Sequence, residues 1–124
     1  MSGSPPTPDR SRAAGGAEES QRAELQAAID WHARRVLAGD AGLRADLAPS
    51  AEIEPPDLIE RLLASGLRDF EVVAHARIGA YHLVKTRYRG RTTLVVQERW
   101  VRGGDGQWRV HEALLVRVAD GDSG

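Results

Sequence analysis

Hydrophobic and polar residues alternate from Phe70 to Val118 with few interruptions, and this pattern predicts β-strands, in which successive side chains point to opposite faces. The strands are expected over residues 70–78, 81–89, 92–102 and 107–118. The turns between them are rich in glycine: Gly79-Ala80, Gly90, and Gly103-Gly104-Asp105-Gly106. Connections this short join neighbouring strands in an antiparallel meander.

The first half of the chain has helical spacing instead. Leu25, Ile29, His32 and Val36 follow one another at intervals of 4, 3 and 4 residues, so residues 20–37 are expected to form an amphipathic helix. A short second helix is expected over residues 41–47. A third should follow Pro55 and Pro56 and end at Gly66. Helices followed by a meander predict an α+β domain, with three N-terminal helices packed on one face of a four-stranded antiparallel sheet.

The ends of the chain lack this patterning. Residues 1–19 are rich in Pro, Gly, Ser and Ala and are expected to form an unstructured tail, because they cannot bury enough apolar surface to offset the entropy of ordering. One domain is expected over residues 20–119, with a flexible C-terminus at 120–124. No apolar run is long enough for a membrane helix or a secretory signal, so the protein is expected to be cytoplasmic and not to bind a membrane.

Assigning alternate residues of the strands to two faces gives one face that is mainly apolar and should meet the helices. It includes His82, Tyr88, Glu98, Trp100, Trp108 and Glu112. The opposite face contains His75, Arg77, Lys85, Arg87, Arg99, Arg109, His111 and Arg117, with Val73, Leu83, Val95 and Leu115 between them.

Three ionisable residues of the apolar face are predicted to lie side by side. Pairing about Gly90 places His82 opposite Glu98, and the next turn places Glu98 opposite Glu112. A carboxyl group buried beside another carboxyl group resists ionisation and therefore suits general acid or base catalysis near neutral pH. His32, on the helical stripe, is expected to face the same space. The structural alternative is that these glutamates lie near strand ends or pair with helix arginines such as Arg22 or Arg34, and that His32 is an ordinary core residue.

The segment Arg99-Trp100-Val101-Arg102, followed by Gly106-Gln107-Trp108-Arg109-Val110, resembles the nuclear-transport-factor-2-like superfamily, and its SnoaL-like branch in particular. A looser similarity covers about residues 20–118. The resemblance implies a cone-shaped α+β barrel, in which a curved sheet wraps around the helices and encloses an apolar pocket. It also implies a homodimer formed through the outer face of the sheet. Members include ketosteroid isomerases, dehydratases, epoxide hydrolases and polyketide cyclases, as well as proteins without catalytic activity.

These expectations give two function hypotheses. In the first, the chain binds a small apolar or polyketide-like compound and, if it is an enzyme, transfers protons without a cofactor, as isomerases, dehydratases, cyclases and epoxide hydrolases do. The catalytic candidates are Glu98 as acid or base, His82 as its partner, and Glu112. The substrate-binding candidates are His32, Trp31, Tyr88, Trp100 and Trp108. In the second hypothesis, the chain is a non-catalytic module of the same fold that dimerises or docks onto another protein.

Other kinds of partner are not expected. The four histidines, His32, His75, His82 and His111, lack the spacing of metal ligands, and the chain has no cysteine and no glycine-rich phosphate loop. Nucleic-acid binding is disfavoured by a net charge of -1 and by the basic face, where Tyr81 is the only aromatic residue available to stack on bases.

Overall fold

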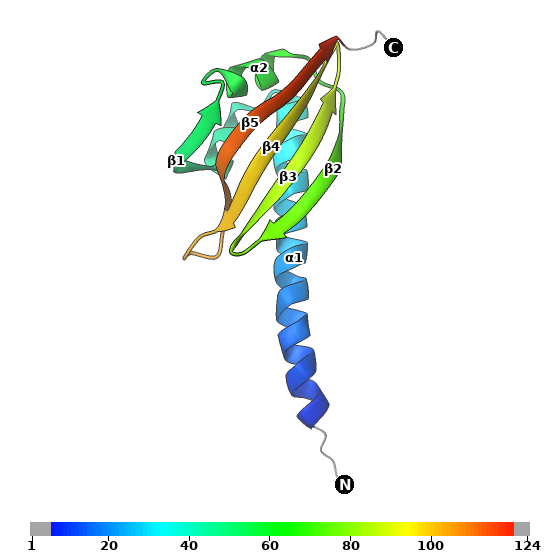
Figure 1. Ribbon diagram of the computed structural model, residues 1–124, viewed down its shortest axis with the longest axis vertical. Helices are drawn as coiled ribbons and strands as arrows, with labels where there is room; N and C mark the ends of the chain where they lie inside the picture. The colour runs from blue at the N-terminus through cyan, green and yellow to red at the C-terminus, as the bar shows by residue number, and fades with distance from the viewer. Residues whose placement is uncertain (1–5, 121–124) are drawn as a thin grey trace. The chain divides into compact units, whose positions relative to one another are not determined.

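A computed structural model describes the backbone of residues 6–120 and the side chains of residues 18–119 (Figure 1). The helical elements are α1 (Pro6–Ala38), the 3-10 helix η1 (Ala41–Asp46) and α2 (Leu58–Ala64). The strands are β1 (Leu47–Glu54), β2 (Asp69–Ile78), β3 (Tyr81–Arg89), β4 (Thr92–Arg102) and β5 (Trp108–Asp120). The chain divides into two compact units at Asp30 and Trp31, and each unit is described by itself.

The first unit consists of the part of α1 that precedes Trp31. This helix begins at Pro6 rather than at residue 20, so residues 6–19, predicted to be unstructured, are helical. Proline is tolerated in the first helical turn, and the alanines and glutamates that follow are strong helix formers. The prediction relied on hydrophobic periodicity, and a helix without an apolar stripe does not show that pattern. Residues 1–5 of the predicted tail and residues 121–124 of the predicted C-terminus lie outside the described residues.

The second unit, from Trp31 onward, is built on a five-stranded sheet in the order β1-β5-β4-β3-β2. The predicted meander of four antiparallel strands is confirmed as β2 to β5. The prediction is wrong about residues 47–54, which form a fifth strand parallel to β5. Pro49 interrupts that segment, but proline is tolerated on an edge strand, where a missing donor breaks no ladder. The sheet is therefore mixed and curved (Figure 1).

Three bulges in the antiparallel meander change which residues share a face. Val73 in β2, and His111 and Val116 in β5, are each an extra residue without a partner on the neighbouring strand. Because side chains alternate with a period of two, an extra residue reverses the faces of everything beyond it. We call the face that carries buried Val84 and Glu98 the inner face, and the opposite side the outer face.

The core of the second unit lies on the inner face. Trp100, Tyr88, Val84, Val96 and Val110 are at most 1% exposed and come from three adjacent strands. Leu43 of η1 and three residues of α2 are buried as well: Leu58, Ile59 and Leu62. On the helical stripe predicted from the sequence, all four residues are buried, as expected: Leu25 and Ile29 belong to the first unit, and His32 and Val36 to the second. Within the described residues no helix is both long and apolar enough to cross a membrane.

The buried turn residue Gly90 gives a test of the fold. A Cβ atom at Gly90 would lie 2.6 Å from the carbonyl oxygen of Gly66 and 2.9 Å from Cα of Leu67, and backbone cannot move aside as a flexible side chain can. Gly90→Ala is expected to lower the free energy of unfolding by about 1–3 kcal/mol, as overpacking does. Urea denaturation measures this change, and Gly104→Ala is the control, because a Cβ atom there meets nothing within 4 Å. Equal losses in both variants would contradict the packing of this turn.

Candidate functional site

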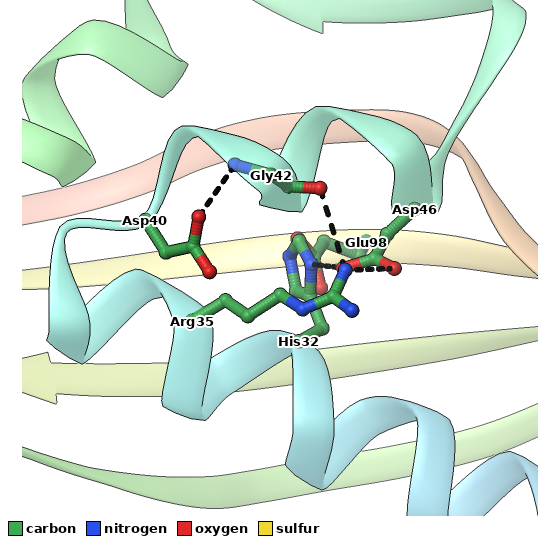
Figure 2. A network of polar contacts seen from close by, with 6 residues as sticks. All are labelled: His32, Arg35, Asp40, Gly42, Asp46 and Glu98. Atoms are coloured by element: carbon green, nitrogen blue, oxygen red, sulfur yellow. Dashed lines mark hydrogen bonds and ion pairs between the residues drawn. The ribbon is translucent and has the colours of Figure 1, made fainter.

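A buried histidine bridges two carboxylates. His32 Nδ1 lies 2.9 Å from Asp46 Oδ2, and His32 Nε2 lies 2.9 Å from Glu98 Oε2 (Figure 2). The side chains of His32 and Glu98 are 1% and 2% exposed, whereas that of Asp46 is 20% exposed. Both ring nitrogens face a carboxylate oxygen, so a doubly protonated imidazolium ring can donate a hydrogen bond at each end.

Three separate elements bring these groups together. His32 comes from the end of α1, Asp46 is the last residue of η1, and Glu98 lies in the middle of β4. The start of η1 is fixed by Asp40, whose Oδ1 accepts a hydrogen bond from the Gly42 amide at 2.8 Å. A short helix capped in this way carries its last residue to a defined place.

Arg35 binds Asp46 at the solvent-facing end of this network. One turn after His32 on α1, its Nη1 donates to Asp46 Oδ1 and to the Gly42 carbonyl oxygen, each at 3.3 Å (Figure 2). Its side chain is 27% exposed, so the arginine faces water on one side and Asp46 on the other. The network therefore runs from a solvent-facing cation to a buried carboxylate: Arg35, Asp46, His32, Glu98.

The two carboxylates hold the proton of His32. Burial of the imidazole on its own lowers the pKa of His32, because it disfavours the charged form. The negative charge of Glu98 and the hydrogen bonds to Asp46 and Glu98 outweigh this effect and raise the pKa of His32 to about 10. His32 is therefore a cation at neutral pH, and its positive charge compensates the carboxylate of Glu98 inside the core.

Aromatic side chains surround the Glu98 end of the network. The Trp100 ring meets the His32 ring edge-on, with centroids 5.5 Å apart. Tyr88 is 1% exposed, and burial together with the negative charge of Glu98 raises the pKa of Tyr88 well above its usual value. The phenol is thus kept neutral and able to donate a hydrogen bond. The structure brings together four residues that the sequence predicts for the site: Glu98, His32, Tyr88 and Trp100.

The predicted partner of Glu98 is wrong. His82 lies on the inner face but opposite Trp100, and Val84 takes the place opposite Glu98. The hairpin turns one position later than a pairing centred on Gly90 would require. His82 Nδ1 instead lies 2.9 Å from His75 Nε2, on the same face, because the bulge at Val73 reverses the second half of β2. The predicted separation of these two histidines onto opposite faces is therefore also wrong.

Glu112 does not join Glu98 either. The bulge at His111 turns it to the outer face, opposite Arg99, with its Oε1 4.0 Å from Arg99 Nε. Ala113 takes the predicted place beside Glu98. The alternative in which the glutamates pair with helix arginines is wrong for both, since Glu98 bonds to a histidine and Glu112 pairs with a strand arginine.

Two predicted substrate-binding residues lie away from Glu98. Trp108 is half-buried on the inner face and meets the ring of His82 edge-on, with centroids 5.5 Å apart. Trp31 is 57% exposed and lines a surface hollow of about 270 Å³, beside the guanidinium group of Arg35. Being one position off the buried stripe of α1 is enough to turn Trp31 outward.

A second hollow, of about 500 Å³, opens on the outer face between β1 and β5. Glu52, Ile53, Glu54, Glu112 and Leu114 line it. Neither hollow is lined by His32 or Glu98. In the described part of the chain, no group of three or more His, Cys, Asp or Glu side chains is placed to hold a metal ion.

Sequence reasoning missed Asp46 and Arg35. Asp46 follows His32 by 14 residues across a turn and a 3-10 helix, and no periodic pattern relates two such positions. Arg35 lies three residues after His32, a spacing that places both on neighbouring positions of one helix surface, so its proximity could have been recognised once His32 was chosen.

Comparison with solved structures identifies the fold. An NTF2-like protein of unknown function from Shewanella baltica OS155 superposes with a TM-score of 0.64 at 8% identity, over 80% of this chain and 94% of that one. One from Silicibacter pomeroyi DSS-3 gives 0.61 at 9% identity, over 82% and 98%. A candidate ketosteroid isomerase from Shewanella frigidimarina NCIMB 400 gives 0.55 at 12% identity, over 71% and 90%.

No protein-family model and no curated protein sequence matches the chain. The structural likenesses confirm the predicted nuclear-transport-factor-2-like fold, and at these sequence identities they concern the fold alone.

Proposed function

We propose that this protein binds a small apolar or polyketide-like molecule and transfers a proton with Glu98, without a cofactor. The observation that carries the proposal is the 2.9 Å contact between Glu98 Oε2 and His32 Nε2 inside the core. His32 takes the partner role that the sequence assigned to His82. A charged carboxylate in apolar surroundings needs a compensating cation, and an acid or base buried in this way is typical of catalytic sites more than of surfaces.

The chemistry follows from the pairing. The imidazolium fixes the Glu98 carboxylate by one hydrogen bond and balances its charge, so the carboxylate can accept a proton from a bound molecule and return it to a neighbouring atom. Such general acid–base catalysis contributes about 10²–10⁴ in rate. Isomerisation, dehydration, cyclisation and epoxide opening all require a transfer of this kind. Because Glu98 is 2% exposed, a substrate reaches it only when covering side chains move.

A ligand screen followed by mutagenesis tests the proposal. Thermal unfolding in the presence of apolar compounds is expected to show a raised midpoint for compounds that bind the folded state. With a compound that is turned over, Glu98→Gln should reduce kcat about 100-fold or more. Glu112→Gln is the matched control and should retain activity, because that glutamate lies on the outer face. Unchanged turnover in Glu98→Gln would rule out Glu98 as the acid or base.

A second proposal concerns assembly, and it is the core of the non-catalytic alternative. The outer face carries half-buried apolar side chains on three adjacent strands, Leu83, Val95, Val101 and Leu114, between charged neighbours. An apolar centre with a charged rim is the usual composition of a protein interface. We infer that two copies of the chain associate through this face. A ligand screen without any hit, together with a stable dimer, would favour the interaction module over the enzyme.

A further inference from the structure

Negative charge gathers at one side of the outer face. Glu52 pairs with Glu112 across β1 and β5, and Glu54 pairs with Leu114. These residues surround the hollow of about 500 Å³ described above, which we call the acidic hollow. Arg99 is 4.0 Å from Glu112 and neutralises part of this charge. Within the described residues, Glu52 and Glu54 have no ion-pair partner in their own chain.

Lys85 is the cation best placed to reach the acidic hollow of a facing molecule. It lies on the same outer face, on β3, two strands away from β5. Leu114 pairs with Gln97, and Gln97 pairs with Lys85, so Glu54 and Lys85 lie at the same level of the sheet. Arg87, the next outward-facing residue of β3, is already bonded to Glu71. Among the described residues Lys85 has no ion-pair partner in its own chain. A lysine side chain is long enough to carry its charge to a facing molecule.

We propose that the outer face binds a second copy of this chain so that Lys85 of each copy enters the acidic hollow of the other. This inference rests on the proposed dimer and specifies its geometry. Dimers of identical chains use a two-fold axis, so one patch must meet its complement on the same surface. For two sheets packed face to face, that axis lies in the plane between them, and its two limiting directions run along the strands and across them.

Charge decides between the two directions. An axis along the strands exchanges the edges of the sheet, so β4 packs on its partner copy and the space between β1 and β5 meets β3 and β2 of the other chain. Lys85 then faces the acidic hollow twice, once in each direction. An axis across the strands would place each strand on its own copy, with hollow against hollow and Lys85 against Lys85. Like charges facing each other are unfavourable, so charge favours an axis close to the strand direction.

Charge reversal with sedimentation equilibrium tests this arrangement. The acid-reversed variant is Glu52→Lys with Glu54→Lys, and the base-reversed variant is Lys85→Glu. Each variant alone should self-associate about tenfold or more weakly than the wild type at low salt. An equimolar mixture of the two should form a mixed dimer at close to wild-type strength, because every contact again joins opposite charges.

Circular dichroism on each variant confirms that it is folded, and Lys85→Gln provides a milder second variant that should weaken association without reversing charge. If the acid-reversed and the base-reversed variants both dimerise as strongly as the wild type, the proposed axis is wrong, although the dimer itself stands. If the acid-reversed chain binds the wild type more tightly than the wild type binds itself, the two acidic hollows face each other, and the axis runs across the strands. A monomeric wild type would overturn both the dimer and its geometry, and it would leave the role of Glu98 untouched.

Discussion

Replacing His32 with alanine is expected to lower the free energy of unfolding by about 3–5 kcal/mol, the usual cost of removing one partner of a buried ion pair. The substitution leaves Glu98 buried at 2% exposure with neither a counter-charge nor its hydrogen bond. It also leaves a cavity beside Trp100. Urea denaturation at neutral pH, followed by circular dichroism, measures the loss.

Two variants separate charge from packing in this experiment. Trp31→Ala removes a larger side chain from the adjacent position of the same helix, and because Trp31 is 57% exposed the loss should stay below about 1 kcal/mol. The double variant His32→Leu with Glu98→Leu removes both charges and fills the space. It should recover much of the stability lost in His32→Ala. Equal losses at His32 and Trp31 would mean that the ion pair is not needed for the fold.

Alkaline pH is expected to weaken the fold through the same residue. The pKa of His32 is about 10 in the folded chain and about 6.5 in an unfolded one. A raised pKa means that the folded state holds its proton more tightly. The stabilising contribution is therefore fully present below about pH 6.5 and is lost as pH rises through about 10. Across that window the contribution amounts to something on the order of 3–5 kcal/mol.

The measurement compares urea denaturation of the wild type and of His32→Gln from pH 6 to pH 11. Other ionisable groups of a protein can also change charge in alkaline solution, so only the difference between the two proteins reports on His32. That difference should shrink steadily above pH 8. A difference that stays constant over the whole range would show that His32 does not carry its proton between the two carboxylates.

Periodicity was sufficient to find the two central residues of this site. Glu98 lies in phase with Leu94, Val96 and Trp100, and a carboxylate that interrupts such a run must face the core if the strand does. His32 interrupts the helical stripe in the same way. A polar residue at an apolar position is therefore a signal that one sequence can give without homologues, and in this protein the two such residues bind each other.

The predicted sheet faces are wrong where one extra residue shifts the alternation of inward and outward side chains along a strand. A bulge adds a position without leaving a turn signal, and the consecutive apolar residues Val72 and Val73 fit either face. The polar pair His111-Glu112 is equally ambiguous, so Glu112 was assigned to the wrong side. Strand β1 was missed for a different reason: its partner β5 lies far along the chain, and local patterns carry no information about parallel pairing over that distance.

The bulge at Val73 also disfavours the addition of further strands from other molecules to the edge of the sheet. β2 is an edge strand, and Val72, Val73 and Ile78 on it are 40%, 40% and 43% exposed. A long, regular edge with apolar side chains invites further chains to add strands and aggregate. Since alternation reverses midway along β2, an incoming strand can match one half of this edge but not both. Sideways stacking into filaments is thereby disfavoured even though this edge exposes three apolar side chains to solvent.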